Sequence, residues 1–401
     1  MQFTEKGVHL TYCTNVHPGE TWLEVFENLK QYIPALKSRL QVENFGIGLR
    51  LSHQAAQQLN VEELNQFKAW LDEQDLYVFT LNGFPYGGFH NQVVKDKVYA
   101  PDWTTPERTN YTKHLANLLA ELLPEGIQGS ISTLPLSYKP WFQNVSEMNE
   151  VLKQSTLNLV EVVVELVSLH QKTGKLIHID LEPEPNGLIE NAAEVLDFFE
   201  NWLLPKGGKE LAKQLNISVS AAEILLREHI QVCYDTCHFS VVYDEPKKVF
   251  QQFQQAGIFI GKIQISAAIK NQLPQDKSER EKLGKYLLGF AESTYLHQVV
   301  ADHGDGQFQS YQDLPDALQD LTETTAQEWR THFHIPIFNQ SYGLLQSTQD
   351  DILKVFDLLQ TNPCPHLEIE TYTFQVLPEQ LKTDLLSSIQ REYEWVLQHY
   401  S

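Results

Sequence analysis

Short runs of β-branched and aromatic residues alternate with longer amphipathic stretches along the whole chain. The amphipathic stretches place apolar residues at three- and four-residue steps, which predicts helices that bury one face. The longest of these stretches covers residues 149–171. The eight short runs predict strands at 8–12, 45–51, 76–81, 129–134, 176–182, 231–235, 262–266 and 367–371.

A regular alternation of strands and helices predicts right-handed βαβ units and a parallel sheet. Eight units favour closure into a (β/α)₈ TIM barrel, an α/β fold, over an open sheet. The chain has no GxGxxG after its first strand and no GxxxxGK[ST], which removes the usual nucleotide-binding alternatives. Since a barrel with insertions reaches 401 residues, we predict a single domain over residues 1–401.

Two connections are longer than ordinary loops, and both follow predicted strands. Residues 267–330, after the seventh strand, predict a helical pair at 280–300 and 313–328 around the segment 301–306. Residues 82–110, after the third strand, are rich in Gly, Pro and aromatic residues. This loop either closes over an apolar or aromatic ligand or packs without one, and its aromatic residues include Phe84, Tyr86, Phe89 and Trp103.

Acidic, amide and imidazole residues gather at the ends of the later strands, which would form the mouth of the barrel and its site. Because side chains alternate along a strand, His178, Asp180 and Glu182 share one face. Carboxylates that face one cavity repel each other unless a cation holds them, which predicts a divalent metal. The candidate site residues are His178, Glu182, Asp235, His238, Gln264, His332, His334 and Glu370.

Structural roles are the alternative for these residues. A helix cap would account for Glu182, a buried hydrogen-bond network for Asp235, and a bridge between strands for Gln264. One of His332 and His334 can likewise be structural, since they lie in a β-like run before Pro336.

The composition narrows the class of partner. The chain has 30 Lys+Arg against 52 Asp+Glu, a formal net charge of −22. This balance argues against nucleic-acid binding, which needs cations to neutralise phosphates. No run approaches the length of a transmembrane helix, and no signal peptide is evident, so we predict no membrane insertion and a cytoplasmic location. Four sparse cysteines fit reduced, buried thiols.

The order of the motifs resembles the xylose isomerase-like TIM barrel superfamily, which includes sugar isomerases, epimerases and apurinic endonucleases. The resemblance rests on the Glu after strand five, the Asp-x-x-His of strand six, the polar residue of strand seven and the Glu-Thr of strand eight. It implies that Glu182, Asp235 and Glu370 are metal ligands. His238 would contact substrate or a second metal, and His332 and His334 match a segment where the endonucleases use an Asp-x-His pair.

Four longer motifs are similar to the EboE family of metabolite traffic proteins, which are encoded in bacterial secondary-metabolite clusters. They are LTYCTNVHPGETW, HIDLEPEPNG, CYDTCHFSV and EIETYTF, and the resemblance runs from Leu10 to about Trp395. It implies a role in delivering a small metabolite precursor, with other proteins of the same gene cluster as partners.

The chain departs from many of the epimerases at strand seven, where Gln264 stands in place of a histidine ligand. An amide oxygen is a neutral donor that favours Mg²⁺ or Mn²⁺ over Zn²⁺. The histidines that the endonucleases carry after strands three and four are absent, which argues against a trinuclear zinc cluster and DNA repair.

Two functions and one blander account remain. In the first, a metal held by Glu182, Asp235, Gln264 and Glu370 serves an isomerase or epimerase that acts on a small metabolite precursor. Glu182 or Glu370 then moves a proton, and His238 binds the substrate oxygen. In the second, the barrel is a non-catalytic protein that binds or escorts the metabolite. A scaffold with partner surfaces only is a third, blander account.

Overall fold

The computed structural model describes residues 1–3 and 7–400. Residues 4–6, which belong to the amino-terminal segment used to predict the absence of a signal peptide, lie outside this description, as does residue 401. Eight parallel strands form the barrel, and all eight predicted strands are confirmed to within two residues at each end. They are β2 (Val8–Tyr12), β3 (Phe45–Arg50), β4 (Leu76–Asn82), β5 (Gly129–Thr133), β6 (Ile177–Leu181), β7 (Ile230–Asp235), β8 (Ile260–Ile265) and β15 (His366–Ile369).

The strands pair in chain order around a nearly closed barrel, with β15 returning between β8 and β2, and β1 (Gln2–Phe3) pairs antiparallel with β2. A single bridge between Cys13 and Gly48 joins β2 to β3. At Gly48 a Cβ atom would stand 2.0 Å from Glu368 Oε1, so only glycine admits that carboxylate to the barrel interior. Since helices cover the outside and side chains fill the inside, nearly every strand residue is buried.

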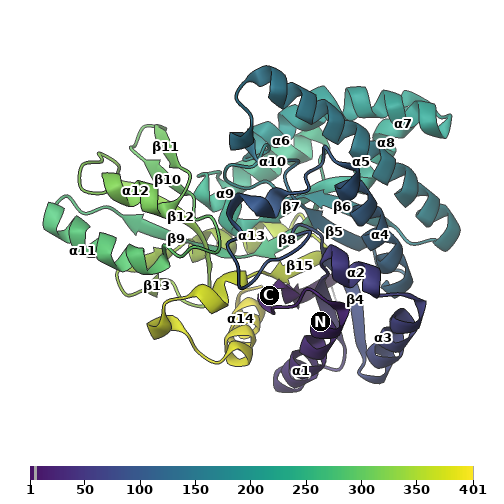
Figure 1. Ribbon diagram of the computed structural model, residues 1–401, viewed down its shortest axis with the longest axis horizontal. Helices are drawn as coiled ribbons and strands as arrows, with labels where there is room; N and C mark the ends of the chain where they lie inside the picture. The colour runs from purple at the N-terminus through teal and green to yellow at the C-terminus, as the bar shows by residue number, and fades with distance from the viewer. Residues whose placement is uncertain (4–6, 401) are drawn as a thin grey trace.

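Helices surround the barrel and connect successive strands, as Figure 1 shows on the right of the view. The predicted stretch 149–171 is confirmed as the longest helix, which extends further at its start. The helices of the barrel are α1 (Trp22–Leu40), α2 (His53–Gln58), α3 (Val61–Glu73), α4 (Pro106–Leu122), α5 (Val145–Thr173), α6 (Ala192–Phe198), α7 (Gly208–Leu215), α8 (Val219–His229), α9 (Thr236–Val241), α10 (Pro246–Ala256), α13 (Gln349–Leu359) and α14 (Leu385–His399).

A second sheet, antiparallel throughout, projects from the carboxyl end of β8, on the left of Figure 1. The chain leaves β8 and continues almost directly into β9, and β12 returns antiparallel to it. The return of β12 towards the barrel carries its final residues back to the mouth. In sheet order the strands are β11 (Phe308–Tyr311), β10 (Val299–Asp302), β12 (Glu328–Ile335), β9 (Ala267–Gln272), β14 (Leu345–Ser347) and β13 (Ser341–Tyr342).

This sheet replaces much of the helical pair predicted after strand seven. The helices there are shorter, α11 (Lys277–Leu287) and α12 (Leu314–Asp320). Residues 301–306 form the end of β10 and most of the turn that leads to β11. Gly304, Asp305 and Gly306 all have positive φ there, which suits the turn. An apolar repeat alone could not separate a short helix from a strand that pairs with distant residues.

Two simpler expectations concern the cysteines and the membrane. All four cysteines are buried and unpaired by disulfides, as predicted. Within residues 1–3 and 7–400, no helix has the length and hydrophobicity that crossing a bilayer demands.

Candidate functional site

Three carboxylates meet at the carboxyl ends of β6, β7 and β15. Glu182 and Glu370 directly follow β6 and β15, and Asp235 ends β7. One oxygen of each lies within 4.8 Å of the other two, and none of the three residues is more than 3% exposed. The barrel therefore brings together three predicted site residues that are up to 188 positions apart in the sequence (370 − 182).

Amide groups hold Glu370 in place. The side-chain amides of Asn15, after β2, and Asn82, at the end of β4, both donate to Glu370 Oε1 over 2.9 Å. The sequence reasoning missed both asparagines, although their position at the ends of strands was a usable signal. Two donors on one oxygen favour the ionised carboxylate, which is the form that binds a cation.

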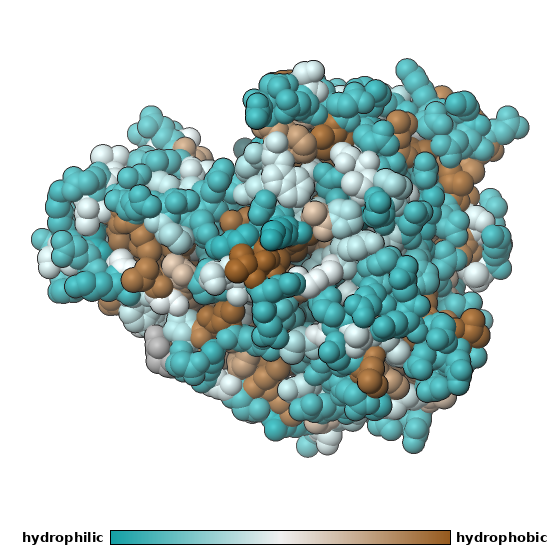
Figure 2. Space-filling model, in the orientation of Figure 1, coloured by the Kyte–Doolittle hydropathy of each residue, from teal (hydrophilic) through white to brown (hydrophobic). Residues whose placement is uncertain are grey.

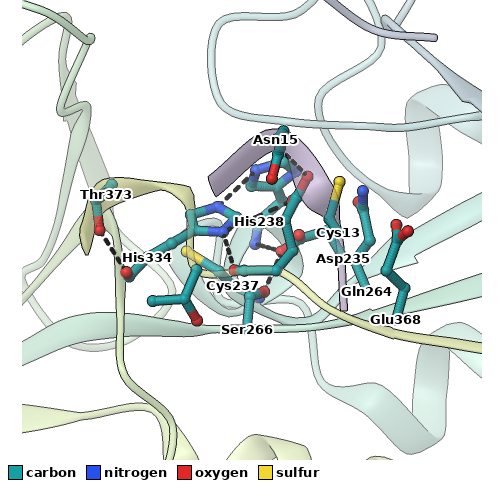
Figure 3. Close-up of polar contacts among 12 residues, drawn as sticks. Cys13, Asn15, Asp235, Cys237, His238, Gln264, Ser266, His334, Glu368 and Thr373 are labelled. Atoms are coloured by element: carbon teal, nitrogen blue, oxygen red, sulfur yellow. Dashed lines mark hydrogen bonds and ion pairs between the residues drawn. The ribbon is translucent and has the colours of Figure 1, made fainter. Parts of the chain in front are cut away.

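The neighbouring carboxylates keep oxygen atoms available. Asp235 Oδ1 accepts from the Ser266 hydroxyl over 2.6 Å and from the backbone N–H of His238 over 3.0 Å (Figure 3). Asp235 Oδ2 and Glu182 Oε2 are buried and have no hydrogen-bond partner among the described residues. A buried carboxylate oxygen without a partner is costly, and a cation would satisfy it.

The electrostatics of the cluster point the same way. Burial, then the charges of Glu370 and Asp235, raise the pKa of Glu182 well above its usual range. Burial, then Asp235 and Glu368, raise the pKa of Glu370 in the same direction. Without a cation these carboxyl groups cannot all ionise together, whereas a divalent ion would favour the ionised forms. The residues present therefore fit a divalent metal.

Gln264 lies on β8 in register with Asp235 on β7 and Glu368 on β15. Its Oε1 accepts from the Cys233 thiol over 3.2 Å, and its buried Nε2 has no partner among the described residues. A turn of the amide group would exchange these two atoms and release the oxygen as a ligand. This arrangement suits the predicted role of Gln264 but does not test it.

Three imidazoles form a second group beside the carboxylates. His334 Nε2 lies 3.2 Å from His238 Nε2 and 3.3 Å from His332 Nε2. His238 follows β7, whereas His332 and His334 lie on β12, whose return from the second sheet brings them to the mouth. Figure 3 shows His238 and His334 side by side above Asp235 and Ser266.

The tautomers of two of these histidines are set by their other ring nitrogen. His332 Nδ1–H donates to Gln298 Oε1 over 2.7 Å, and His334 Nδ1–H donates to the backbone oxygen of Glu370 over 2.8 Å. Their Nε2 lone pairs then face each other. Burial, followed by the neighbouring imidazoles, lowers the pKa of His332 and His238 well below the usual range. These rings are therefore neutral, and no extra proton is held between their nitrogen atoms. A second cation fits this position.

The structure does not bring His178 to this group. His178 Nδ1 bonds to Asp180 Oδ1 over 2.7 Å, and its ring packs edge-on against His366. Strand periodicity assigns His178 and Glu182 to the same face, but four residues of extended chain separate them by about 13 Å. His178 therefore lies near the start of β6, whereas the site lies beyond its end. The two-residue period predicts the face of a residue but not its position along the barrel axis.

Glu184 is a pocket residue that the sequence reasoning noted in its motif but did not select. Its Oε2 lies 3.8 Å from His238 Nε2, and burial raises its pKa to about 8. The continued two-residue spacing of His178, Asp180, Glu182 and Glu184 was the available signal, although strand periodicity does not persist reliably into a loop.

A pocket of about 60 Å³ opens above the carboxylates. Its floor is polar and includes Glu182, Glu184, His238 and Glu370. Apolar and aromatic side chains form the walls, and hydrophobic side chains also show near the centre of the face in Figure 2. The wall residues are Phe84, Pro85, Phe89, Val94, Val98, Tyr99, Tyr295, Leu296 and Tyr372.

The two predicted insertions meet over this pocket. The backbone N–H groups of Val94 and Lys95 donate to the carbonyl oxygen of Thr294 over 2.8 and 2.9 Å. Lys95 also pairs with Asp313 over 2.6 Å, and the loop crosses in front of the barrel strands in Figure 1. The contacts fix the loop as a wall of the pocket.

Only part of the aromatic loop can face a ligand. Phe84 and Phe89 line the pocket, which agrees with the interpretation that the loop closes over a ligand. Tyr86 instead stacks on His53, with ring centroids 4.6 Å apart, and Trp103 is fully buried with its indole N–H donating to Thr133. The loop therefore serves partly as a wall and partly as packing, a division that composition cannot reveal.

Glu392, on α14, supports the end of β15. Its Oε1 accepts from the Thr371 hydroxyl over 2.6 Å and from the backbone N–H of Ile337, and burial raises its pKa to about 7. A raised carboxyl pKa means that the folded protein holds a proton between about pH 4.5 and 7 that the unfolded chain releases. The Glu392 contribution to stability therefore grows as the pH falls from 7 to 4.5.

We expect Glu392→Gln to remove this dependence, because glutamine keeps the acceptor oxygen and never ionises. The gain in unfolding free energy over wild type should be largest above pH 7 and should shrink on acidification, by up to about 3 kcal/mol. Urea unfolding of both proteins at pH 5 and pH 8 measures this difference. Equal differences at the two pH values would contradict the assignment.

No model of a known protein family matches the chain, and no curated protein matches it. Several solved structures are similar. One is D-psicose 3-epimerase in the presence of D-fructose, at 11% identity and a TM-score of 0.49, covering 98% of this chain and 99% of that chain. Another is a xylose isomerase-like TIM barrel protein from Mycobacterium smegmatis in complex with magnesium, at 9% identity and a TM-score of 0.48, covering 100% and 98%.

A third is IOLI protein with a zinc atom, at 14% identity and a TM-score of 0.45, covering 98% of each chain. These neighbours are barrel proteins, and two of them hold a metal ion. At such identities the likeness carries no argument about the reaction of this chain, which must rest on its own residues.

Proposed function

We propose that this protein is a metal-dependent enzyme of the isomerase or epimerase type that acts on a small metabolite. The observation that carries the proposal is the buried trio of Glu182, Asp235 and Glu370, of which Glu182 and Glu370 line the pocket. Glu182 Oε2 and Asp235 Oδ2 have no hydrogen-bond partner among the described residues. Keeping such charges together without a ligand would be unfavourable, so their juxtaposition supports a site that binds a cation and works beside it.

Glu182, Asp235, Gln264 and Glu370 would hold the metal. Carboxylate and amide oxygens favour Mg²⁺ or Mn²⁺, and Zn²⁺ is the competing ion. When bound, such an ion supplies a Lewis acid for adjacent hydroxyl and carbonyl oxygens of a substrate. The imidazoles of His238, His332 and His334 are softer donors, and they would hold a second ion or a substrate oxygen.

Glu182 is the better candidate to move a proton at the carbon beside the carbonyl. Glu182 Oε2 has no hydrogen-bond partner in the part of the chain that the structure describes, whereas two amides donate to Glu370 Oε1. His238 Nδ1 lies 3.7 Å from Glu182 Oε1. A substrate whose carbon is beside Glu182 would therefore place its oxygen within reach of a hydrogen bond from His238. The aromatic walls would exclude water from this proton transfer.

The walls of the pocket support a class of ligand. A pocket with carboxylates and imidazoles at its floor and Phe84, Phe89, Tyr99 and Tyr295 on its sides suits a molecule that is oxygen-rich at one end and apolar at the other. A metabolite precursor of this kind agrees with the resemblance to the metabolite traffic family. Proteins of the same gene cluster would then supply or receive the molecule.

The second candidate is a non-catalytic escort on the same barrel, and Gln264 favours it. A neutral amide in place of an imidazole weakens a metal site, and a weaker site suits binding more than turnover. The two functions differ in one observable: an enzyme exchanges or relocates a substrate proton, and an escort binds the same molecule unchanged.

Deuterium exchange tests the choice. The protein is incubated with Mn²⁺ in D₂O with enolisable sugars and with hydroxyketones that carry an aromatic group, and NMR follows the carbon-bound protons. We expect exchange that falls at least about hundredfold in Glu182→Gln. Glu190→Gln is the matched control, because Glu190 follows the same strand but pairs with Lys139 outside the pocket lining.

Binding of one of these compounds without exchange would sink the enzyme proposal and favour the escort. Exchange that survives in Glu182→Gln would instead reject Glu182 as the group that moves the proton.

A further inference from the structure

Another set of potential metal ligands lies outside the mouth, where β6 and β7 begin. It consists of His170, in the last turn of α5, and Glu228 and His229, the last two residues of α8. One donor atom from each lies within 4.8 Å of the other two. The helices α5 and α8 pack against each other (Figure 1), and their carboxyl ends meet here.

His229 is already prepared as a ligand. Its Nδ1–H donates to the carbonyl oxygen of Ile177 over 2.7 Å, which leaves the lone pair on Nε2. The side chain is fully buried, and Nε2 has no hydrogen-bond partner among the described residues. A backbone carbonyl that fixes the tautomer through the other ring nitrogen is the usual support of a metal-bound histidine.

The other two donors complete an open site. Glu228 Oε2 lies 3.8 Å from His229 Nε2, and the Glu228 side chain is 40% exposed, so an ion can enter from solvent. The rings of His170 and His229 stand nearly perpendicular, with centroids 6.5 Å apart. The adjacent Arg227 does not compete with a cation, since its guanidinium donates to the carbonyl oxygens of Ala256 and Gly257.

The local field also favours a positive ion. Both helices present their carboxyl ends, where the aligned backbone dipoles leave a partial negative charge. Glu228 adds a full negative charge. Two imidazoles and one carboxylate are a zinc donor set, in which water takes the fourth tetrahedral position.

We propose that His170, Glu228 and His229 bind a zinc ion that joins the ends of α5 and α8. This site is independent of the mouth and of the proposed function, because it shares no residue with either metal-binding group there. Its occupancy would link the start of β6 to the start of β7 and hold the two helices together at that end.

Zinc stoichiometry tests the site in the full-length protein. Wild type, His170→Gln and Glu228→Gln are dialysed against the same buffered free Zn²⁺, and bound zinc is counted by elemental analysis. Both substituted residues are only half-buried, so the variants should fold. We expect each variant to bind one equivalent fewer than wild type, or to bind that equivalent at least tenfold more weakly.

Two further proteins sharpen the result. Glu223→Gln is the control, because Glu223 lies on α8 but outside the donor group, and it should keep the wild-type count. Glu182→Gln/Asp235→Asn should lose zinc from the mouth and keep the equivalent assigned to His170, which separates this site from the proposed function. An unchanged count in His170→Gln and Glu228→Gln would overturn the proposal.

Discussion

Replacing Glu182 and Asp235 together, as Glu182→Gln/Asp235→Asn, is expected to weaken divalent metal binding at the mouth by more than about hundredfold. Loss of a supporting residue around a metal site already costs about 10- to 100-fold in affinity, and here two ligands are lost. The variant should stay folded. It removes two buried carboxylates whose repulsion destabilises the metal-free protein, so its metal-free form should be at least as stable as metal-free wild type.

Elemental analysis of the purified proteins, followed by Mn²⁺ titration, measures the first effect, and urea unfolding in a chelator measures the second. Glu190→Gln serves again as the control carboxylate. Equal metal occupancy of the mouth in wild type and the double variant, both folded, would remove the basis of the proposed function.

A single Gln264→His variant should shift the metal preference of the mouth towards Zn²⁺, since imidazole is the softer donor.

Breaking the buried ion pair between Lys262 and Glu368 should have the largest effect on stability. Lys262 Nζ lies 2.5 Å from Glu368 Oε2, both side chains are 0% exposed, and the pair sits inside the barrel beneath the site. Lys262→Met leaves an uncompensated buried carboxylate, which costs about 3–5 kcal/mol. The double variant Lys262→Met/Glu368→Met should recover most of this loss, because it replaces the pair with apolar groups of similar volume.

Lys262 also acts on the site above it. Its positive charge lowers the pKa of Glu182 and Glu370, against the stronger effect of burial. In metal-free Lys262→Met, the pKa of both carboxyl groups should therefore be higher than in metal-free wild type. Denaturant midpoints and NMR titration of the carboxyl groups in a chelator give the two readouts. If neither readout changes, the ion pair neither stabilises the fold nor affects the pKa of the site carboxyl groups.

The amino-acid sequence determined the barrel and the identity of most groups at its mouth. Parallel strands that are buried on both faces read as nearly continuous apolar runs, and a polar residue at the end of such a run stands out. Glu182, Asp235 and Glu370 could be selected for this reason. Their convergence also followed from the closed sheet, since successive strands end at one rim.

The tertiary structure alone decided three other matters. It placed His178 below the site, because strand periodicity fixes the face of a residue and not its depth. It built the antiparallel sheet that carries His332 and His334 back to the mouth, because hydrogen bonds between β9 and β12 join residues whose separation no local pattern records.

It also assembled the supports of the site from distant parts of the chain. Asn15 and Asn82 reach Glu370 only after the barrel closes, and the pocket walls form only where the two insertions pack together. Local sequence sets the chemistry and the faces of the elements. Contacts between remote segments set the distances, and it is the distances that turn these residues into a site.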